Sequence, residues 1–418
     1  MTIAMSASGS VAPAEVSVLR RQLRRAERLG KLRAFGLLLP LLLFIVISFV
    51  IPIIMMLTNA VYDPDFRDNL PKTLAALESW DGKDLPDEAV YAALVEDFKG
   101  VRERNSQALL GKRLNYEISG IRSKFIGSVS KAEKIVAPPY KEAMIAADKM
   151  WGDPNTWAKL GQVGHAITPS YLLAAVDLEQ NAGGGISAVP ANRQIYFSIM
   201  MRTFYISLLV TVVTLILGFP VAYVLANTSP NWANLLIILV LLPFWTSLLV
   251  RTTAWYVLLL DNGLINEVIM GLGLSSEPVK LIFSRFGTII AMVHIQLPFT
   301  LLPIYSVMKG ISPTYMRAAR SLGGGPVYSF WRIYLPQTLP GIGAGCLLTF
   351  ILSLGYYITP ALVGGPADQM VSGFIAQAIN QENNWGKASA LGTILLVATL
   401  ILYWVYNRLV GIDKVKLG

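Results

Sequence analysis

The sequence predicts an all-α membrane protein with six transmembrane helices and a small, mostly helical domain inserted between the first and second of them. Of the 418 residues, 54% are hydrophobic and only 15% are charged, whereas soluble domains carry about 25% charged residues. The charges avoid several long apolar stretches, each of the length that a helix needs to cross a bilayer. Residues 58–200 have instead the composition of a soluble domain. These three observations set the fold class.

The first three spans come from two charge-free stretches. Ala34–Tyr62 holds no charge and is long enough for one span. Thr203–Val250 is too long for one helix, and the turn-forming residues "NTSPNWAN" (227–234) divide it. The first three predicted spans are therefore 35–57, 205–226 and 235–259.

Three further apolar stretches complete the set. Phe286–Met308 and Ala388–Asn407 carry no charge and are about 20 residues long. A glycine- and proline-containing apolar stretch at 339–362 lies between them. Because membrane helices tolerate such residues when neighbours satisfy the freed backbone groups, it is predicted as the fifth span.

Lysine and arginine near the span ends predict the orientation. The basic residues before the first span are Arg20, Arg21, Arg24, Arg25, Arg28, Lys31 and Arg33. Against only Glu15 and Glu27, they place residues 1–34 in the cytoplasm, and six crossings return the tail, 412–418, to the same side. The connection 309–336 is also predicted to be cytoplasmic, and the 58–200 insertion extracytoplasmic.

The insertion contains two segments with helical spacing of apolar residues, at 86–114 and 138–153. Trp80, Trp151 and Trp157 are expected in the core of this domain, because large aromatic side chains bury the most apolar surface. The sequence does not indicate what the insertion does.

Several function classes lack their motifs. The chain has one cysteine, Cys346, and two histidines far apart in sequence, so no metal site is predicted. It has neither a phosphate-binding G-x-x-x-x-G-K-[ST] loop nor a recognisable nucleophile or catalytic motif. No basic and aromatic stretch suggests nucleic-acid binding. We therefore expect a chain without catalytic residues.

The connection at 309–336 contains the stretch "YMRAARSLGGGPVYSFWRIYLP". Ser312 and Pro313 are typical of a helix start, and Gly323 is expected to end that helix in the left-handed conformation. A second helix is predicted from Pro326 to Leu335, with Pro336 ending it. This helix–glycine–helix unit interrupts the apolar spans without being a plain loop.

The spacing within this connection matches a known motif. Ala318-Ala319, three residues, Gly323, nine residues, Ile333, one residue and Leu335-Pro336 resembles the E-A-A-x3-G-x9-I-x-L-P loop of the membrane subunits of binding-protein-dependent ABC importers. Residues 242–266 and 353–366 are similar to the corresponding parts of spermidine/putrescine-type permeases. The likeness covers 196–418 well and 1–57 loosely, but not the insertion.

The resemblance implies a type I ABC importer permease, with the permease core at 201–411 and 309–336 as its coupling loop. In that family the first helix of the loop docks on an ATPase subunit. The implied coupling residues are Arg317, Ala318, Ala319, Gly323, Ile333, Leu335 and Pro336. Arg317 stands where the family usually has Glu, which puts the charge of the docking contact in question.

The resemblance also implies the partners and the location. They are an ATPase subunit dimer, a second permease subunit, a periplasmic solute-binding protein and the lipid bilayer of the bacterial inner membrane. ATP and magnesium would bind to the ATPase, and no cofactor to this chain. The implied solute is a polyamine such as putrescine or spermidine, or a related amine or amino-acid-derived compound.

Four residues are candidates for the substrate pathway. Trp255, Tyr356 and Tyr357 offer aromatic faces to a cation, although aromatic residues also gather at membrane interfaces. Arg251 suits a solute carboxylate, or extends toward the membrane surface as long basic side chains do. No Asp or Glu lies in the predicted spans.

Two other functions remain open from the sequence. A stand-alone secondary carrier or channel would need no ATPase, but such proteins commonly use intramembrane acids and paired repeats, which are not apparent. A membrane-anchored receptor would use the insertion as a sensor, but no cytoplasmic output domain is visible. Neither alternative explains the spacing of residues 318–336.

Overall fold

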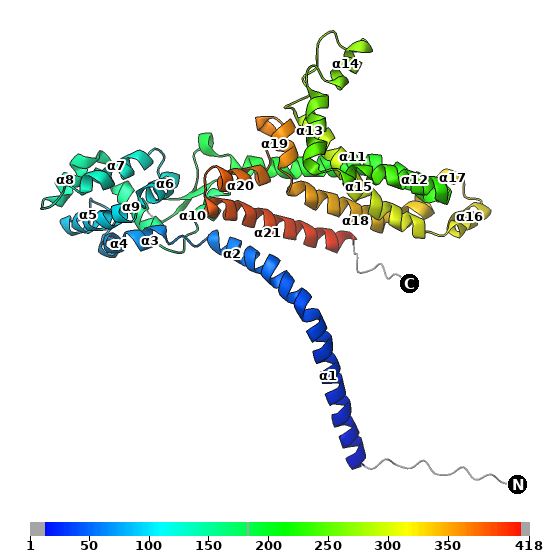
Figure 1. The fold of residues 1–418 in the computed structure, drawn as a ribbon, viewed down its shortest axis with the longest axis horizontal. Coiled ribbons are helices and arrows are strands. Elements are labelled where there is room, and N and C mark those ends of the chain that lie inside the picture. Colours follow the sequence, from blue (N-terminus) through cyan, green and yellow to red (C-terminus); the bar gives the residue numbers. More distant parts are fainter. Residues whose placement is uncertain (1–12, 182–183, 411–418) are drawn as a thin grey trace. The chain divides into compact units, whose positions relative to one another are not determined.

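The computed structural model describes residues 13–181 and 184–410, so residues 1–12 and the proposed cytoplasmic tail at 412–418 lie outside the described residues. Within these ranges, six helices are long and apolar enough to cross a membrane (Figure 1). The predicted number of spans is therefore confirmed. The six are Arg33–Asn59, Tyr196–Asn227, Leu248–Gly271, Arg285–Gly310, Pro326–Leu354 and Trp385–Arg408.

The first span belongs to one continuous helical segment. It consists of α1 (Pro13–Ile45), a π-helical turn at Val46–Val50, and α2 (Ile51–Asn59). Pro52 lies two residues after the end of the π turn, and proline both lacks an N–H and crowds the preceding turn. The wider π turn accommodates this ring without ending the helix.

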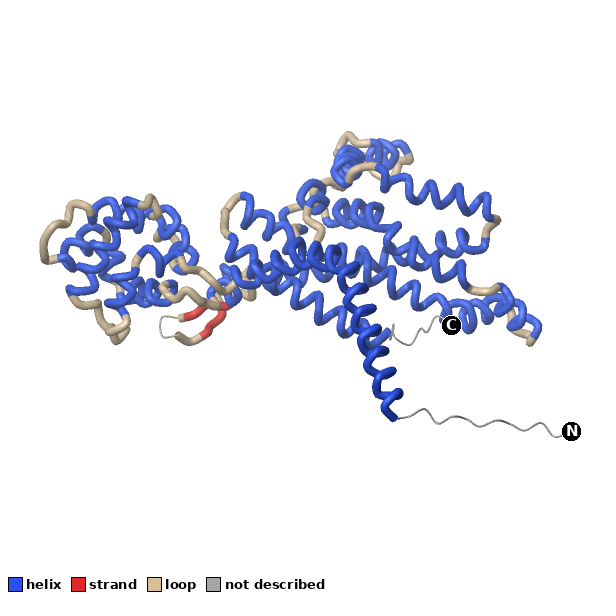
Figure 2. The backbone as a smooth tube through the Cα atoms, turned by 60° about the horizontal axis from the view of Figure 1, so that its bottom comes forward, coloured by secondary structure: helices blue, strands red, loops and turns tan. Residues whose placement is uncertain are grey.

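The insertion, defined here as residues 60–195, is mostly helical, as predicted. Its helices are α3 (Asp65–Asn69), α4 (Pro71–Leu77), α5 (Glu88–Glu103), α6 (Gln107–Glu117), α7 (Arg122–Ala132), α8 (Tyr140–Ala147), η2 (Lys149–Gly152), α9 (Pro154–Val163), α10 (Ser170–Ala174) and η3 (Ala191–Arg193). A short antiparallel pair, β1 (Leu178–Gln180) and β2 (Ile186–Ala188), pairs Glu179 with Ser187. Figure 2 shows this sheet in red, at the end of the insertion next to the core helices.

Aromatic side chains form the core of the insertion. Trp151 and Trp157 are fully buried, as expected, and Trp80 is half-buried. The Tyr91 hydroxyl and Trp157 Nε1 both donate to the carbonyl of Trp151, at 2.6 and 3.0 Å. Burial raises the pKa of Tyr91 to about 12, so this hydroxyl remains a hydrogen-bond donor at neutral pH. The polar ends of the buried rings are thereby satisfied.

The two helical segments predicted within the insertion are each divided. Asn105 has a φ of 54°, in the left-handed region, so the segment predicted at 86–114 forms α5 and α6 separately. Asp148 ends α8 and accepts a hydrogen bond from the Met150 N–H at 3.0 Å, starting η2. Both breaks arise from local backbone conformation and hydrogen bonding, which cannot be predicted from hydrophobic periodicity.

The helices after the insertion form the core of the predicted spans. They are α11 (Tyr196–Asn227), α12 (Pro230–Leu241), η4 (Leu242–Trp245), α13 (Leu248–Leu259), α14 (Leu264–Gly271), α15 (Arg285–Gly310), α16 (Pro313–Ser321), α17 (Pro326–Ser329), η5 (Phe330–Tyr334), α18 (Leu335–Leu354), α19 (Ile358–Val363), η6 (Pro366–Asp368), α20 (Val371–Asn380) and α21 (Trp385–Val410). The most extensive packing joins α11, α15 and α18.

Small and hydroxyl side chains allow this close packing. A Cβ added at Gly345 would lie 2.5 Å from the carbonyl oxygen of Thr300, so α15 and α18 touch backbone to backbone there. The Thr300 hydroxyl lies 2.9 Å from that of Thr214 and 2.6 Å from that of Thr349. These three buried threonines link α11, α15 and α18, as small and polar residues do between membrane helices.

The third span differs from the prediction of one helix at 235–259. The chain forms α12, breaks at η4 and restarts as α13, because Pro243 cannot donate to the helical ladder. The Ser247 side chain then accepts from the Val250 N–H at 3.2 Å and caps α13. The apolar helix that qualifies as a span is Leu248–Gly271, beyond the break.

The fifth span is shifted from the predicted 339–362 to Pro326–Leu354. It ends at Gly355, and α19 begins separately at Ile358. In a continuous helix Pro360 would leave the Tyr356 carbonyl without its donor. That carbonyl instead accepts a hydrogen bond from the Ser372 hydroxyl.

Because α15 and α18 approach closely at Gly345, we expect that adding one methyl group at this position lowers the stability of the core. We expect Gly345→Ala to destabilise the core by about 1–3 kcal/mol, the usual cost of overpacking, because Thr300 backbone atoms must move. Thermal unfolding of the purified chain in detergent measures the effect. Gly355→Ala is the matched control, since a Cβ there meets nothing closer than 3.7 Å; equal stability of the two variants would contradict the proposed contact.

Candidate coupling loop and transport pathway

The loop between α15 and α18 begins with a capped helix, as the sequence predicts. The Ser312 hydroxyl accepts a hydrogen bond from the Thr314 N–H at 3.3 Å, and Pro313 occupies the first helical position. Pro313 costs nothing there, because the first N–H groups of a helix have no partner inside it. The resulting helix, α16, runs to Ser321.

A left-handed glycine ends α16. Gly323 has a φ of 87°, and its N–H donates to the Arg320 carbonyl at 3.0 Å. The next residue, Gly324, donates to the Ala319 carbonyl at 3.0 Å, and a Cβ at 324 would lie 2.8 Å from that oxygen. The first two glycines of the triplet therefore have separate tasks, one in backbone conformation and one in close approach.

The second half of the loop differs from the prediction. Pro336 was expected to end the helix begun at Pro326, but the helix continues into the fifth span through the π turn η5. The π turn shifts the hydrogen-bond ladder just before Pro336, and this makes room for the ring. The Gln337 side chain donates to the Ile333 carbonyl at 2.7 Å. The second half of the loop is thus continuous with α18.

Aromatic residues that the sequence analysis did not single out anchor the loop to α11. The Phe330 ring stacks on Tyr334 with centroids 5.8 Å apart. Tyr223 of α11 meets these two rings edge-on, at 5.7 and 5.5 Å. The signal available in the sequence was the spacing of four between Phe330 and Tyr334, which places both on one helix face.

The predicted coupling residues divide into an exposed and a half-buried group. Exposed residues are Arg317, Ala318, Gly323 and Pro336, and half-buried residues are Ala319, Ile333 and Leu335. Leu322 beside them is 89% exposed. Residues 309–336 contain four basic and no acidic residues. The tip of the loop therefore presents a positive surface with apolar side chains, which is typical of a protein-binding site.

Two of the four pathway candidates lie together. Arg251 and Trp255 are one turn apart on α13, and Trp255 Nε1 donates to Nδ1 of His294 on α15 at 3.0 Å. The Arg251 guanidinium carbon lies 5.8 Å from the centre of the Phe244 ring. Its Nε and Nη1 atoms are buried and lack a hydrogen-bond partner among the described residues. These groups make a polar, aromatic patch between α13 and α15.

The other two candidates form no hydrogen bond with this patch, although Tyr356 lies near enough to Arg251 to interact with its charge. Tyr356 packs against a buried cluster that includes Ile206 and Met292. Tyr357 directly precedes α19 and is 43% exposed. The structure thus brings Arg251, Trp255 and His294 into one patch, and Tyr356 and Tyr357 reach no hydrogen bond to it.

Comparison with known proteins places the helical core in a family. The family described as "binding-protein-dependent transport system inner membrane component" matches residues 181–411. This range takes in α11 to α21, including the coupling loop, and leaves out nearly all of the insertion.

Individual relatives agree with this assignment. The chain is 31% identical over 262 residues to the spermidine/putrescine transport system permease protein PotB of Haemophilus influenzae, covering 60% of this chain and 91% of that one. The PotB of Escherichia coli K12 is 33% identical over 226 residues, 53% of this chain and 82% of the relative. The inner membrane ABC transporter permease protein YdcU of the same strain is 30% identical over 260 residues, with coverage of 59% and 78%.

A solved structure also aligns with the chain. It is a bacterial ABC transporter involved in the import of the acidic polysaccharide alginate, with 19% identity and a TM-score of 0.42, covering 53% of this chain and 80% of that one. The family match and the extent of the PotB alignments decide the assignment. This chain belongs to the family of inner-membrane components of binding-protein-dependent transport systems.

Proposed function

We propose that this permease moves a small amine, a polyamine such as putrescine or spermidine or a related compound, across the bacterial inner membrane. A periplasmic binding protein delivers the solute, and ATP hydrolysis on a separate subunit drives the cycle. The chain supplies the path and the coupling between ATP and path, and no bond-making chemistry. The transporter alternates between a state open to the outside and a state open to the cytoplasm. ATP drives this alternation because the ATPase subunits bind it more tightly in one of the two states.

The observation that carries the proposal is the form of the coupling loop. Its tip is exposed, and its base is continuous with α18 through η5. Its aromatic anchor contacts α11 through Tyr223. A partner that displaces α16 therefore moves the ends of two spans at once. A carrier that works without an ATPase needs no exposed loop that transmits movement from a partner to two spans.

We propose that the ATPase dimer docks on α16 through Arg317, Ala318 and Ala319. Two alanines allow close backbone approach, and the basic residues around them favour an acidic partner surface. Where other family members have Glu, Arg317 reverses the charge of one contact. The docking cleft of the cognate ATPase is therefore expected to carry an acidic residue opposite Arg317.

The proposed orientation places the coupling loop in the cytoplasm and the insertion outside. The contacts of the spanning helix α11 support opposite sides of the membrane for these two elements. Asp177 of the insertion accepts hydrogen bonds from the first turn of α11, whereas the loop aromatics contact Tyr223 near the last turn of α11. The basic residues of the loop favour the cytoplasmic side. A second permease subunit would complete the pathway.

The names of the relatives support a polyamine as solute, and aromatic rings such as Trp255 can contact a cation. A specific observation favours a second candidate, an amine that also bears a carboxylate. Arg251 has two buried nitrogens free of hydrogen bonds to described residues. A carboxylate is the group that pairs best with a guanidinium.

Replacement of Gly323 tests coupling. We expect Gly323→Val to lower solute uptake per ATP hydrolysed several-fold in the reconstituted transporter, because a β-branched residue is strained at a φ of 87° by about 1–3 kcal/mol. Gly325→Val is the control, since Gly325 has a φ of −62° and an added Cβ meets nothing within 4 Å. Unchanged uptake per ATP in Gly323→Val would count against the coupling role.

Replacement of Arg251 separates the two solute classes. If the solute is a polyamine, Arg251→Gln should maintain or increase spermidine uptake in vesicles, because a positive charge that repels the solute is removed. A decrease of about tenfold or more would instead favour a carboxylate-bearing solute. Equal amounts of inserted protein and equal basal ATPase rates provide the control.

A further inference from the structure

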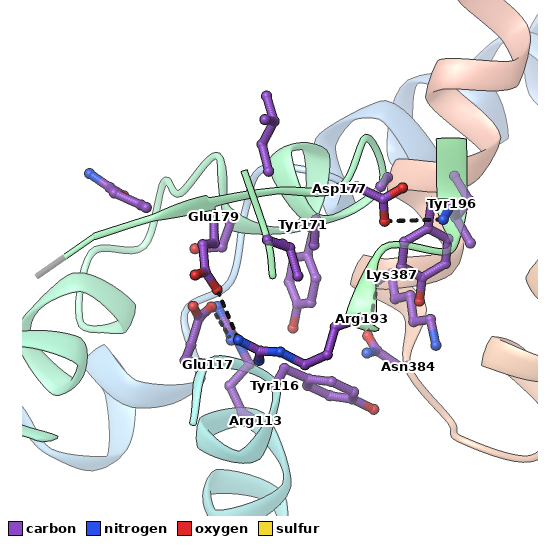
Figure 3. Close-up of a pocket in the computed structure, with 17 residues that line it drawn as sticks. Arg113, Tyr116, Glu117, Tyr171, Asp177, Glu179, Arg193, Tyr196, Asn384 and Lys387 are labelled. Carbon is purple, nitrogen blue, oxygen red and sulfur yellow. Dashed lines mark hydrogen bonds and ion pairs between the residues drawn. The ribbon is translucent and has the colours of Figure 1, made fainter. Parts of the chain in front are cut away.

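A cavity of about 210 Å³ lies where the insertion meets the first turns of α11 and α21 (Figure 3). In Figure 3, Arg113 of α6 lies on one side of it and Asn384 and Lys387 lie on the other, while the Tyr116 ring of α6 extends toward Asn384. Tyr171 of α10 stands between them. The cavity is separate from the coupling loop and from the Arg251 patch. The family match, 181–411, includes Asn384 of the lining but not Arg113 or Tyr171.

Arg113 is the most deeply buried charge in the wall of the cavity. Its side chain is 3% exposed and forms ion pairs with Asp63 and with Glu117, the latter at 2.9 Å. Burial opposes its charge, but Tyr171, Glu117 and Asp63 outweigh burial and raise its pKa, so it stays protonated. The remaining nitrogen, Nη2, is buried and has no hydrogen-bond partner in the described part of the chain. A charged donor left without an acceptor is costly.

Asn384 supplies a second such donor from the opposite wall. The residue is 6% exposed, and its Oδ1 accepts a hydrogen bond from the Lys387 N–H at 3.0 Å, which caps α21. This contact fixes the orientation of the amide, so Nδ2 is the free end. Nδ2 is buried and makes no hydrogen bond of normal geometry to a described residue, although the Tyr116 hydroxyl lies near enough to interact with it.

The acidic groups around the cavity already have partners. Asp177 accepts three backbone N–H groups at the start of α11, from Ile195, Tyr196 and Phe197, at 3.0, 3.1 and 2.7 Å. Glu117 is paired with Arg113, and Glu179 lies 3.8 Å from Arg193. The buried lining atoms that make no hydrogen bond to a described residue, Arg113 Nη2 and Asn384 Nδ2, are both donors. A bound molecule that brings an acceptor would satisfy them.

We propose that this cavity binds the carboxylate of a small amphipathic molecule, held by Arg113 Nη2 and Asn384 Nδ2. Carboxylates form the strongest hydrogen bonds with such donors. The rest of the molecule would lie against tyrosine rings and apolar side chains such as Val189 and Leu391. The three basic and three acidic side chains in the lining cancel, which favours a monoanion or a zwitterion over a dianion.

A ligand in this place joins the insertion to the sixth span. One donor comes from α6 and the other from the N-cap of α21, so occupancy ties the two elements together. The insertion would therefore form part of an effector-binding site, a role that its sequence did not indicate. This proposal does not depend on the identity of the transported solute.

Propionate is a probe of this site, and propylammonium is its counterpart without an acceptor. We expect sodium propionate to raise the thermal unfolding midpoint of the purified full-length chain, above sodium chloride at the same ionic strength. Propylammonium chloride should produce no such rise, because it brings only donors. Titration gives the half-saturating concentration, and binding of radiolabelled propionate to the same preparation is an independent readout.

Asn384→Asp tests the contact itself. The aspartate retains the oxygen that caps α21 but replaces the Nδ2 donor with a negative charge, so the half-saturating concentration of propionate should rise about tenfold or more. Asn155→Asp makes the same change at an exposed helix start in the insertion and should retain the wild-type response. The proposal is overturned if propionate neither binds nor stabilises the wild type, or if Asn384→Asp responds as the wild type does.

Discussion

The backbone contact between α15 and α18 is the constraint on which the rest of the helical core depends. Gly341 and Gly345 present no side chains to α15, and a Cβ at either would lie within 3 Å of a carbonyl oxygen of that helix. The hydroxyls of Thr214, Thr300 and Thr349 add α11 to the pair. Because the coupling loop connects α15 to α18, a force on its tip acts on two helices that cannot slide apart freely. In the proposed coupling role, this tight packing would convert docking of a partner on the loop into movement of the spans.

Prolines within the membrane helices lie next to π turns or at helix breaks, where the backbone can accommodate the loss of a hydrogen bond. Pro52 and Pro336 each follow a π turn, and the helix passes through without a break. Pro243 instead lies in a break, where Ser247 caps the next helix. Membrane helices tolerate such residues only where other groups replace the missing hydrogen bonds. The same residue type therefore has two outcomes, decided by the neighbouring backbone.

Hydrophobicity and capping residues were sufficient to predict the number of spans, the start of α16 at Ser312 and the turn at Gly323. These features depend on local chemistry, which a single sequence displays. The continuation of the helix through Pro336 and the shift of the fifth span depend on π turns and on tertiary acceptors such as the Ser372 hydroxyl. Likewise, Arg251 and Trp255 could be associated by their spacing, but their neighbour His294 is 39 positions from Trp255 in sequence. Distant contacts of this kind leave no periodic signal.

The most direct test of the account is a crosslink between the tip of the coupling loop and its proposed engine. In a Cys346→Ser background, which removes the half-buried native thiol, Ala318→Cys should crosslink to the cognate ATPase in inner-membrane vesicles. Asn155→Cys, exposed on the insertion, should not. Absence of any ATPase adduct at position 318 would contradict a cytoplasmic coupling loop. So would labelling of that cysteine by a membrane-impermeant thiol reagent in cells in which only the outer membrane has been permeabilised.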